Sequence, residues 1–75
     1  MIDETLPVPF HVQLSDILRA RIQAGDWEYR LPSINTLVQE YQIGRNTVLT
    51  ALDTLKAEGL ITAVHGKGFY IVKQR

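Results

Sequence analysis

The sequence predicts an α+β fold in which three helices are followed by a two-stranded β-hairpin. Three stretches, at about 9–24, 33–42 and 44–58, place apolar side chains at helical spacing. A fourth stretch, at about 60–72, holds two short β-prone runs around a Gly-Lys-Gly turn. Seventy-five residues, 45% of them apolar, suffice for one small core but not for two. We therefore expect a single domain over residues 1–75.

The composition excludes several classes of function. The chain has no cysteine, so it can form neither a disulfide framework nor a thiolate metal site. His11 and His65 fall in different predicted elements without paired carboxylates around them, so we expect no catalytic residue, no metal, no cofactor and no enzyme activity. Met1 is followed by Asp3 and Glu4 rather than by a basic and then apolar run, and no stretch is long enough to span a bilayer. The composition thus predicts a cytoplasmic protein with no membrane partner.

The net charge is zero, whereas proteins that bind DNA phosphates usually carry a basic excess. The two signs are nevertheless distributed unevenly along the chain. Five acidic residues lie within the first 28 positions: Asp3, Glu4, Asp16, Asp26 and Glu28. From Arg30 onward, six basic residues meet three acidic ones. The later part of the chain therefore has a mild basic bias.

The first helix is expected to begin at Pro9 or Phe10 and to end at Gly25, which can adopt the left-handed conformation that closes a helix. Apolar residues recur at helical spacing, at Phe10, Leu14, Ile17, Leu18 and Ile22. The polar residues between them are Gln13, Asp16, Arg19 and Gln23. This pattern predicts a helix that packs the core. We interpret Arg19 and Arg21 as solvated charges opposite the buried stripe, with phosphate contact as the alternative.

The second helix is expected to start at Ser33, whose hydroxyl can accept a hydrogen bond from a free amide of the first turn. One apolar face follows, formed by Ile34, Leu37, Val38 and Tyr41. The helix is short, and the next helix begins almost at once. So tight a joint forces the two helices to cross steeply, as in a helix-turn-helix.

The third helix is predicted to bury Val48, Ala51, Leu52 and Leu55, which are spaced by three, four and seven residues. Its first two turns carry the polar residues Arg45, Asn46, Thr47 and Thr50. The N-terminal end of a recognition helix meets base edges and phosphates, and free amides there favour an anion. The alternative is ordinary helix-start chemistry, in which small polar residues only cap the helix.

The last stretch favours the DNA-binding interpretation. Gly59 is expected to end the third helix, residues 60–64 to form a strand, His65-Gly66-Lys67-Gly68 to turn the chain, and residues 69–72 to return. A hairpin directly after a helix-turn-helix is a wing, and Lys67 at its tip can meet a phosphate or the minor groove. A lysine in an exposed turn also occurs in proteins that bind no nucleic acid. Only in combination with Arg45 does Lys67 indicate a DNA-binding surface.

These residues resemble the N-terminal DNA-binding domain of GntR-family bacterial transcriptional regulators over nearly the whole chain. The resemblance is carried by Pro9-Phe10 with Gln13 and Leu18-Arg19, Leu31-Pro32-Ser33, Arg45-Asn46-Thr47-Val48, Ala51-Leu52, Leu55, Glu58-Gly59-Leu60-Ile61, and Gly66-Lys67-Gly68 closing in Val72. It implies a winged helix-turn-helix that binds a near-palindromic operator on double-stranded DNA as a homodimer, with a separate C-terminal domain that senses a small-molecule effector. The chain ends at Lys73-Gln74-Arg75, directly after the second wing strand, so we expect that effector domain to be absent from it.

Several positions depart from the family pattern. Asn35 and Leu49 stand where the family usually has arginine, Gly44 stands in place of a serine cap, and Ala63-Val64 replace a stretch that is often basic. Each lost phosphate-contacting cation weakens DNA binding and flattens its salt dependence. The departures therefore bear on affinity and operator preference rather than on the fold. Leu49 either contacts a thymine methyl or extends the edge of the core, and we favour the second interpretation.

The main hypothesis is a sequence-specific transcription regulator, a repressor or an activator, with the third helix in the major groove and the wing at the minor groove. Its predicted DNA-binding residues are Ser33, Asn35, Arg45, Asn46, Thr47, Leu49, His65, Gly66 and Lys67. Arg45 suits a phosphate or guanine, Asn46 an adenine edge, and Thr47 a phosphate or a thymine methyl. The alternative is a protein-interaction module that uses an exposed patch of Leu49, Val64 and Tyr70.

Overall fold

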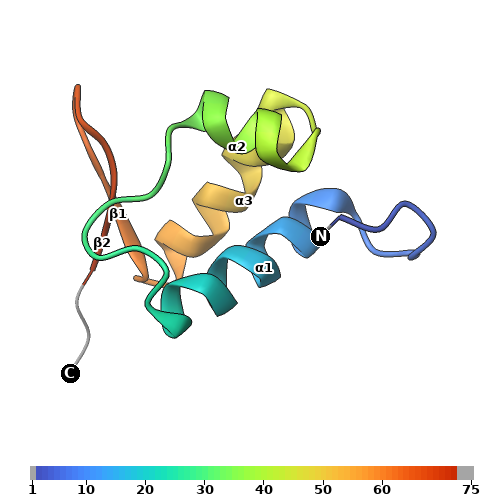
Figure 1. Cartoon of the computed structure of the whole chain (residues 1–75), viewed down its shortest axis with the longest axis horizontal. Coiled ribbons are helices and arrows are strands. Elements are labelled where there is room, and N and C mark those ends of the chain that lie inside the picture. The colour runs from blue at the N-terminus through green and yellow to red at the C-terminus, as the bar shows by residue number, and fades with distance from the viewer. Residues whose placement is uncertain (1, 73–75) are drawn as a thin grey trace.

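The computed structural model describes residues 2–72 and has the predicted order of elements (Figure 1). The helices are α1 (Phe10–Ala24), α2 (Ile34–Tyr41) and α3 (Arg45–Ala57), and the strands are β1 (Ile61–Val64) and β2 (Gly68–Ile71). The two strands pair antiparallel, with Ile61 opposite Ile71 and Val64 opposite Gly68. This is the winged helix-turn-helix that the sequence predicted. Residues 73–75, where a linker to an effector domain was expected to begin, lie outside the described residues.

The helix ends follow the local signals of the sequence, with one exception. Gly25 is left-handed at φ 81° after α1, and the Ser33 hydroxyl accepts a hydrogen bond from the Thr36 N–H at 3.1 Å at the start of α2. The exception is Gln42, which ends α2 with φ 55° and ψ 48° although it is not glycine. A side chain in this left-handed region is disfavoured by a clash with the backbone, so the tight joint between α2 and α3 stores some strain.

The core gathers around α3, which packs against α1, α2 and β1. The four residues predicted for its buried face, Val48, Ala51, Leu52 and Leu55, are all at most 1% exposed. The rest of the core comes from the other elements and their joints: Leu14, Leu18, Leu31, Leu37, Ile43 and Ile61. Because α1, α2 and β1 all pack against α3 and β2 pairs with β1, the position of the polar side of α3 relative to the wing is fixed by this shared core.

The pattern of α1 was only partly interpreted correctly. Gln13, expected on the polar side, is buried at 7% exposure, whereas Phe10 is exposed at 37%. The Gln13 amide accepts from the Asp3 N–H at 2.7 Å and donates to the Asp3 and Val8 carbonyls, each at 2.9 Å. It thus satisfies backbone groups of the segment that precedes α1. Periodicity within one helix cannot show such a partner, because the partner lies outside the helix.

The wing is fixed to the rest of the fold by the segment that leads into α2. The Leu31 N–H donates to the Phe69 carbonyl at 3.0 Å, and the Ile71 N–H donates to the Tyr29 carbonyl at 2.7 Å. Between them, Arg30 forms an antiparallel bridge with Tyr70 of β2. The hairpin therefore has a partner along one edge, and its tip is held in a defined place relative to α2.

Candidate nucleic-acid interface

The first turn of α3 has exposed amides and no side-chain cap. Gly44 occupies the capping position and offers no side-chain acceptor. The first backbone hydrogen bond of the helix runs from the Val48 N–H to the Gly44 carbonyl at 3.2 Å, so the amides of residues 45–47 precede the internal ladder. In α2, by contrast, the Ser33 hydroxyl accepts a hydrogen bond from one of the first-turn amides, that of Thr36. The start of α3 therefore keeps the partial positive charge that attracts an anion.

The structure brings together two predicted DNA-binding residues from different helices. Arg45 Nη1, at the start of α3, donates a hydrogen bond to Asn35 Oδ1 of α2 at 3.1 Å. Both side chains are exposed, as is that of Asn46. An amide oxygen can orient a guanidinium without cancelling its charge. Arg45 is therefore held in place yet keeps its full charge for a nucleic acid.

The remaining residues predicted near this end differ in their surroundings. The Ser33 hydroxyl is already engaged, because it also lies 2.9 Å from the Thr36 hydroxyl. Thr47 is half-buried, and so is Leu49, which does not belong to the buried core cluster. The predicted role of Ser33 as a cap is confirmed. Its contact with DNA, like those of Thr47 and Leu49, stays a prediction.

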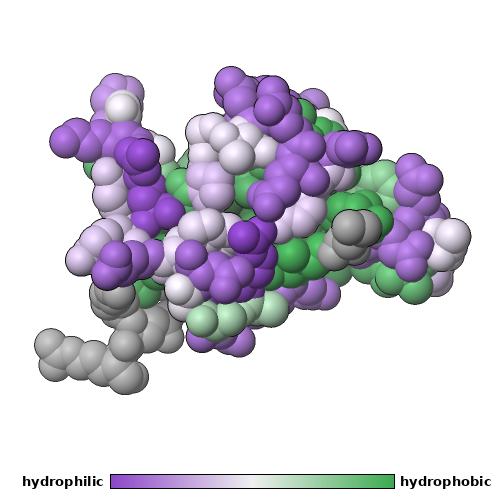
Figure 2. Space-filling view, in the orientation of Figure 1, coloured by the Kyte–Doolittle hydropathy of each residue, from purple (hydrophilic) through white to green (hydrophobic). Residues whose placement is uncertain are grey.

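The predicted wing residues His65, Gly66 and Lys67 form the tip of the hairpin and are all exposed. The Lys67 N–H donates to the Val64 carbonyl at 2.9 Å and closes the turn, and Gly66 has φ 75°, a value that an ordinary side chain disfavours. Figure 1 shows the wing tip, α2 and the yellow start of α3 along the upper edge, with α1 along the lower edge. Figure 2 shows that hydrophilic residues cover most of this upper edge. We call it the recognition edge, defined by Asn35, Arg45, Asn46, Thr47 and Lys67.

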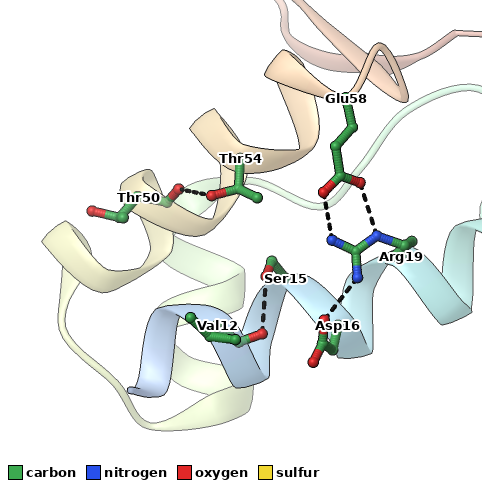
Figure 3. A network of polar contacts seen from close by, with 7 residues as sticks. All are labelled: Val12, Ser15, Asp16, Arg19, Thr50, Thr54 and Glu58. Carbon is green, nitrogen blue, oxygen red and sulfur yellow. Dashed lines mark hydrogen bonds and ion pairs between the residues drawn. The ribbon is translucent and has the colours of Figure 1, made fainter. Parts of the chain in front are cut away.

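Arg19 of α1 is fully engaged by carboxylates (Figure 3). Its Nε and Nη2 donate to the two oxygens of Glu58 at 2.8 and 2.6 Å, and Nη1 donates to Asp16 at 2.7 Å. These hydrogen bonds raise the pKa of Arg19 and lower the pKa of Glu58. Arg19 lies at the surface as expected of a solvated charge, but its pairing was not predicted, because the end of α3 brings a carboxylate across to α1. Arg19 is a link between two helices.

Arg21 is engaged in a similar way near the end of α1. It donates to Asp26 at 2.8 Å, to the Tyr41 hydroxyl at 2.7 Å and to Glu40 at 3.3 Å. The guanidinium also lies 4.4 Å from the centre of the Trp27 ring, within the range of a cation–π contact. Arg21 therefore ties α1 to the end of α2, and these partners were not predicted although the side chain remains partly exposed.

Among the described residues, the cations outside the surroundings of α1 have no such carboxylate partners. Within residues 2–72, the ion pairs use Arg19 and Arg21, and none involves Arg30, Arg45, Lys56 or Lys67. Arg30 was missed by the sequence reasoning, although it directly precedes the Leu31-Pro32-Ser33 signal. Its Nη1 donates only to the Lys67 carbonyl, at 3.4 Å. The neutral net charge thus hides a separation, within residues 2–72, into paired arginines around α1 and cations elsewhere that form no ion pair.

Other kinds of site receive little support from the described part of the chain. Residues 2–72 contain no group of three or more His, Cys, Asp or Glu side chains arranged to hold a metal ion. No helix among them combines the length and the apolar character needed to cross a membrane. The patch expected for a protein-interaction module is also poorly exposed, because Leu49 and Tyr70 are half-buried and only Val64, at 37%, is exposed.

Comparison with known proteins agrees with this geometry. Residues 11–71 match the family model of bacterial regulatory proteins, gntR family. The chain is 37% identical over 73 residues to the probable rhizopine catabolism regulatory protein MocR of Rhizobium meliloti, covering 95% of this chain and 15% of that protein. It is 36% identical over 67 residues to the HTH-type transcriptional regulator YdfD of Bacillus subtilis, covering 87% of this chain and 14% of that protein. The names of these relatives are those of transcription regulators rather than enzymes, and the chain spans only about a seventh of their length.

A solved structure connects the fold with DNA. The N-terminal domain of AraR, crystallised with a mutant of the operator ORR3, superposes with a TM-score of 0.83 at 25% identity, covering 92% of this chain and all of that one. The gntR family model matches residues 11–71, which is most of the chain. This chain belongs to the GntR family of bacterial regulatory proteins.

Proposed function

We propose that the chain is the DNA-binding domain of a bacterial transcription regulator, with the start of α3 in the major groove and the wing tip at the flanking minor groove. The observation that carries this proposal is the charge separation across the fold. Within the part of the chain that the structure describes, Arg45 and Lys67 lie on the recognition edge without carboxylate partners, whereas Arg19 and Arg21 are paired with carboxylates around α1. The operator complex of AraR supports the same use of this fold.

Each part of the recognition edge has a distinct role in this proposal. The free amides at the start of α3 bind a phosphate, and Arg45 reads a guanine edge or holds a second phosphate. Asn46 suits an adenine edge, because an amide can both donate to and accept from that base. Lys67, with His65 and Gly66, contacts the backbone beside the minor groove. Asn35 orients Arg45 through the hydrogen bond at 3.1 Å.

For the whole regulator we propose a homodimer on a near-palindromic operator, with half-sites roughly 10 base pairs apart. A further domain would sense a small-molecule effector and set the direction of regulation. The support is that this chain corresponds to only 14–15% of the length of the two relatives named above. Because the target is the chromosome, we expect the regulator to act in the cytoplasm.

The proposal is tested by titrating the isotope-labelled chain with a mixed-sequence duplex while backbone amide shifts are followed by NMR. We expect residues 44–49 and 65–68 to move together at low salt and the effect to fade as salt rises, because phosphate contacts release counterions. An absence of movement at low salt would contradict DNA binding. Movement confined to residues 49, 64 and 70 with a protein partner would favour the interaction module instead.

A further inference from the structure

Arg30 lies between the wing and α2, outside the set of residues that the sequence predicted to bind DNA. Its backbone bridges to Tyr70 of β2, and the next residue, Leu31, is hydrogen-bonded to Phe69. Leu31 is buried at 3% exposure, whereas Arg30 is exposed. Successive side chains of an extended segment point to opposite sides, so Arg30 points away from the core. The strand pairing holds it in place beside the wing.

Among the described residues, no carboxylate offsets the charge of the Arg30 guanidinium. Its hydrogen bond goes to the Lys67 carbonyl, a neutral acceptor, and no ion pair within residues 2–72 involves Arg30 or Lys67. The bond also turns the Arg30 side chain toward the wing turn that carries Lys67. Two uncompensated cations therefore belong to the same corner of the molecule.

A groove of about 280 Å³ opens at this corner, between the wing and the start of α2. Lys67 of the wing, Ser33 at the start of α2 and Arg30 in the segment that leads into α2 all line it. Both walls belong to elements that we propose to face DNA. The groove is thus continuous with the recognition edge and offers positive charge without a carboxylate to offset it.

We infer that Arg30 binds a backbone phosphate of the DNA in this groove. The inference rests on the proposed function, and it adds a contact that the sequence reasoning did not assign. Because a phosphate carries no base identity, Arg30 contributes to affinity and register rather than to base selection. It supplies a cation on a surface where Asn35 and Leu49 are uncharged.

The test measures duplex affinity by fluorescence anisotropy at several salt concentrations for the natural chain and three variants. Arg30→Gln removes the charge but keeps a donor for the Lys67 carbonyl, and Arg30→Lys keeps the charge. Lys56→Gln is the matched control, because Lys56 is an exposed cation without an ion pair in the last turn of α3, at the opposite end of that helix from Arg45.

The loss of one phosphate contact should reduce the slope of log affinity against log salt by about 0.9. The ratio of the duplex affinity of the natural chain to that of Arg30→Gln should then fall about 3.5-fold between roughly 50 and 200 mM salt. Arg30→Lys and Lys56→Gln should keep the natural slope. An unchanged slope for Arg30→Gln, or an equal reduction for Lys56→Gln, would overturn the inference while DNA binding stands. A natural chain without salt-dependent binding would overturn the proposed function and this inference with it.

Discussion

The arginines around α1 are in a different electrostatic setting from Arg45 of the recognition edge and Arg30 beside it. Arg19 and Arg21 are held by carboxylates, whereas Arg30 and Arg45 are held by a backbone carbonyl and an amide oxygen. A carboxylate neutralises the guanidinium, and a phosphate would have to displace it. A neutral oxygen positions the guanidinium and leaves its charge available. Whether a cation is available to DNA is therefore decided by its partner, not by the net charge of the chain.

The strongest test of this comparison is Arg45→Ala. We expect it to cost about 1–3 kcal/mol of binding to a cognate operator, because it removes an unpaired cation from the start of the recognition helix. Stability should hardly change, since the side chain is exposed and bonds only to Asn35. Operator affinity and the midpoint of urea unfolding check the two parts separately.

Asn35→Ala tests the positioning of the Arg45 side chain separately from its charge. It leaves the charge of Arg45 intact but removes the acceptor at 3.1 Å, so its effect on affinity should be smaller than that of Arg45→Ala. The double variant should bind no more weakly than Arg45→Ala alone if Asn35 acts only through Arg45. Full additivity would show that Asn35 has a DNA contact of its own.

The converse test is Arg21→Met, which keeps a long apolar stem but removes the guanidinium. We expect a loss of about 1–2 kcal/mol in the free energy of unfolding, because the variant gives up the contact with Trp27, the hydrogen bond to Tyr41 and two partly exposed ion pairs. Urea denaturation measures this loss. The duplex affinity of the folded fraction should stay unchanged, and a specific fall in affinity would break the division between the two sides.

Much of the fold was predictable because the signals are local. The buried face of α3 follows from apolar spacing alone, and the start of α2 follows from one serine hydroxyl. Gln13 was misplaced because its partners, Asp3 and Val8, precede the helix. Where a polar residue finds backbone groups to satisfy, burial no longer follows the hydrophobic pattern.

The candidate site was predictable in its residues but not in their partners. The sequence singles out Arg45 because it lies at the start of the third helix, and Lys67 because it lies in the glycine turn of the wing. The pairing of Arg19 with Glu58 joins residues 39 positions apart, and no spacing rule shows it. Arg30 was missed for the same reason, since its place beside the wing depends on the bridge to Tyr70. Charge availability is a property of tertiary contacts.

A smaller effect is expected at the joint between α2 and α3, on which the position of the recognition edge depends. Gln42→Gly should stabilise the fold by about 0.5 kcal/mol, because relief of the left-handed strain exceeds the added entropy of the unfolded chain. Gln42→Ala is the control and should bring no gain, since alanine meets the same backbone clash. The free energy of unfolding in urea distinguishes them. A gain for alanine as well would mean that φ 55° is not the source of the effect.

The smallest effect concerns pH and sharpens the account of the paired side. The hydrogen bonds from Arg19 lower the pKa of Glu58 below its ordinary value of 4.5. The unfolded chain therefore binds more protons around this pH, so the pair adds stability above pH 4.5 that is lost as pH falls through the pKa of the folded state. The midpoint temperature of thermal unfolding should be slightly lower for Glu58→Gln than for the natural chain near neutral pH, and the two midpoints should converge in acid. The difference should shrink in salt, because the pair is at the surface.

Arg19→Gln is the partner variant and should cause a loss of stability with the same pH dependence. In the Arg19→Gln background, Glu58→Gln should have no further effect, since either substitution alone removes the link between α1 and the end of α3. An offset that is independent of pH would show that Glu58 acts through packing rather than through its charge.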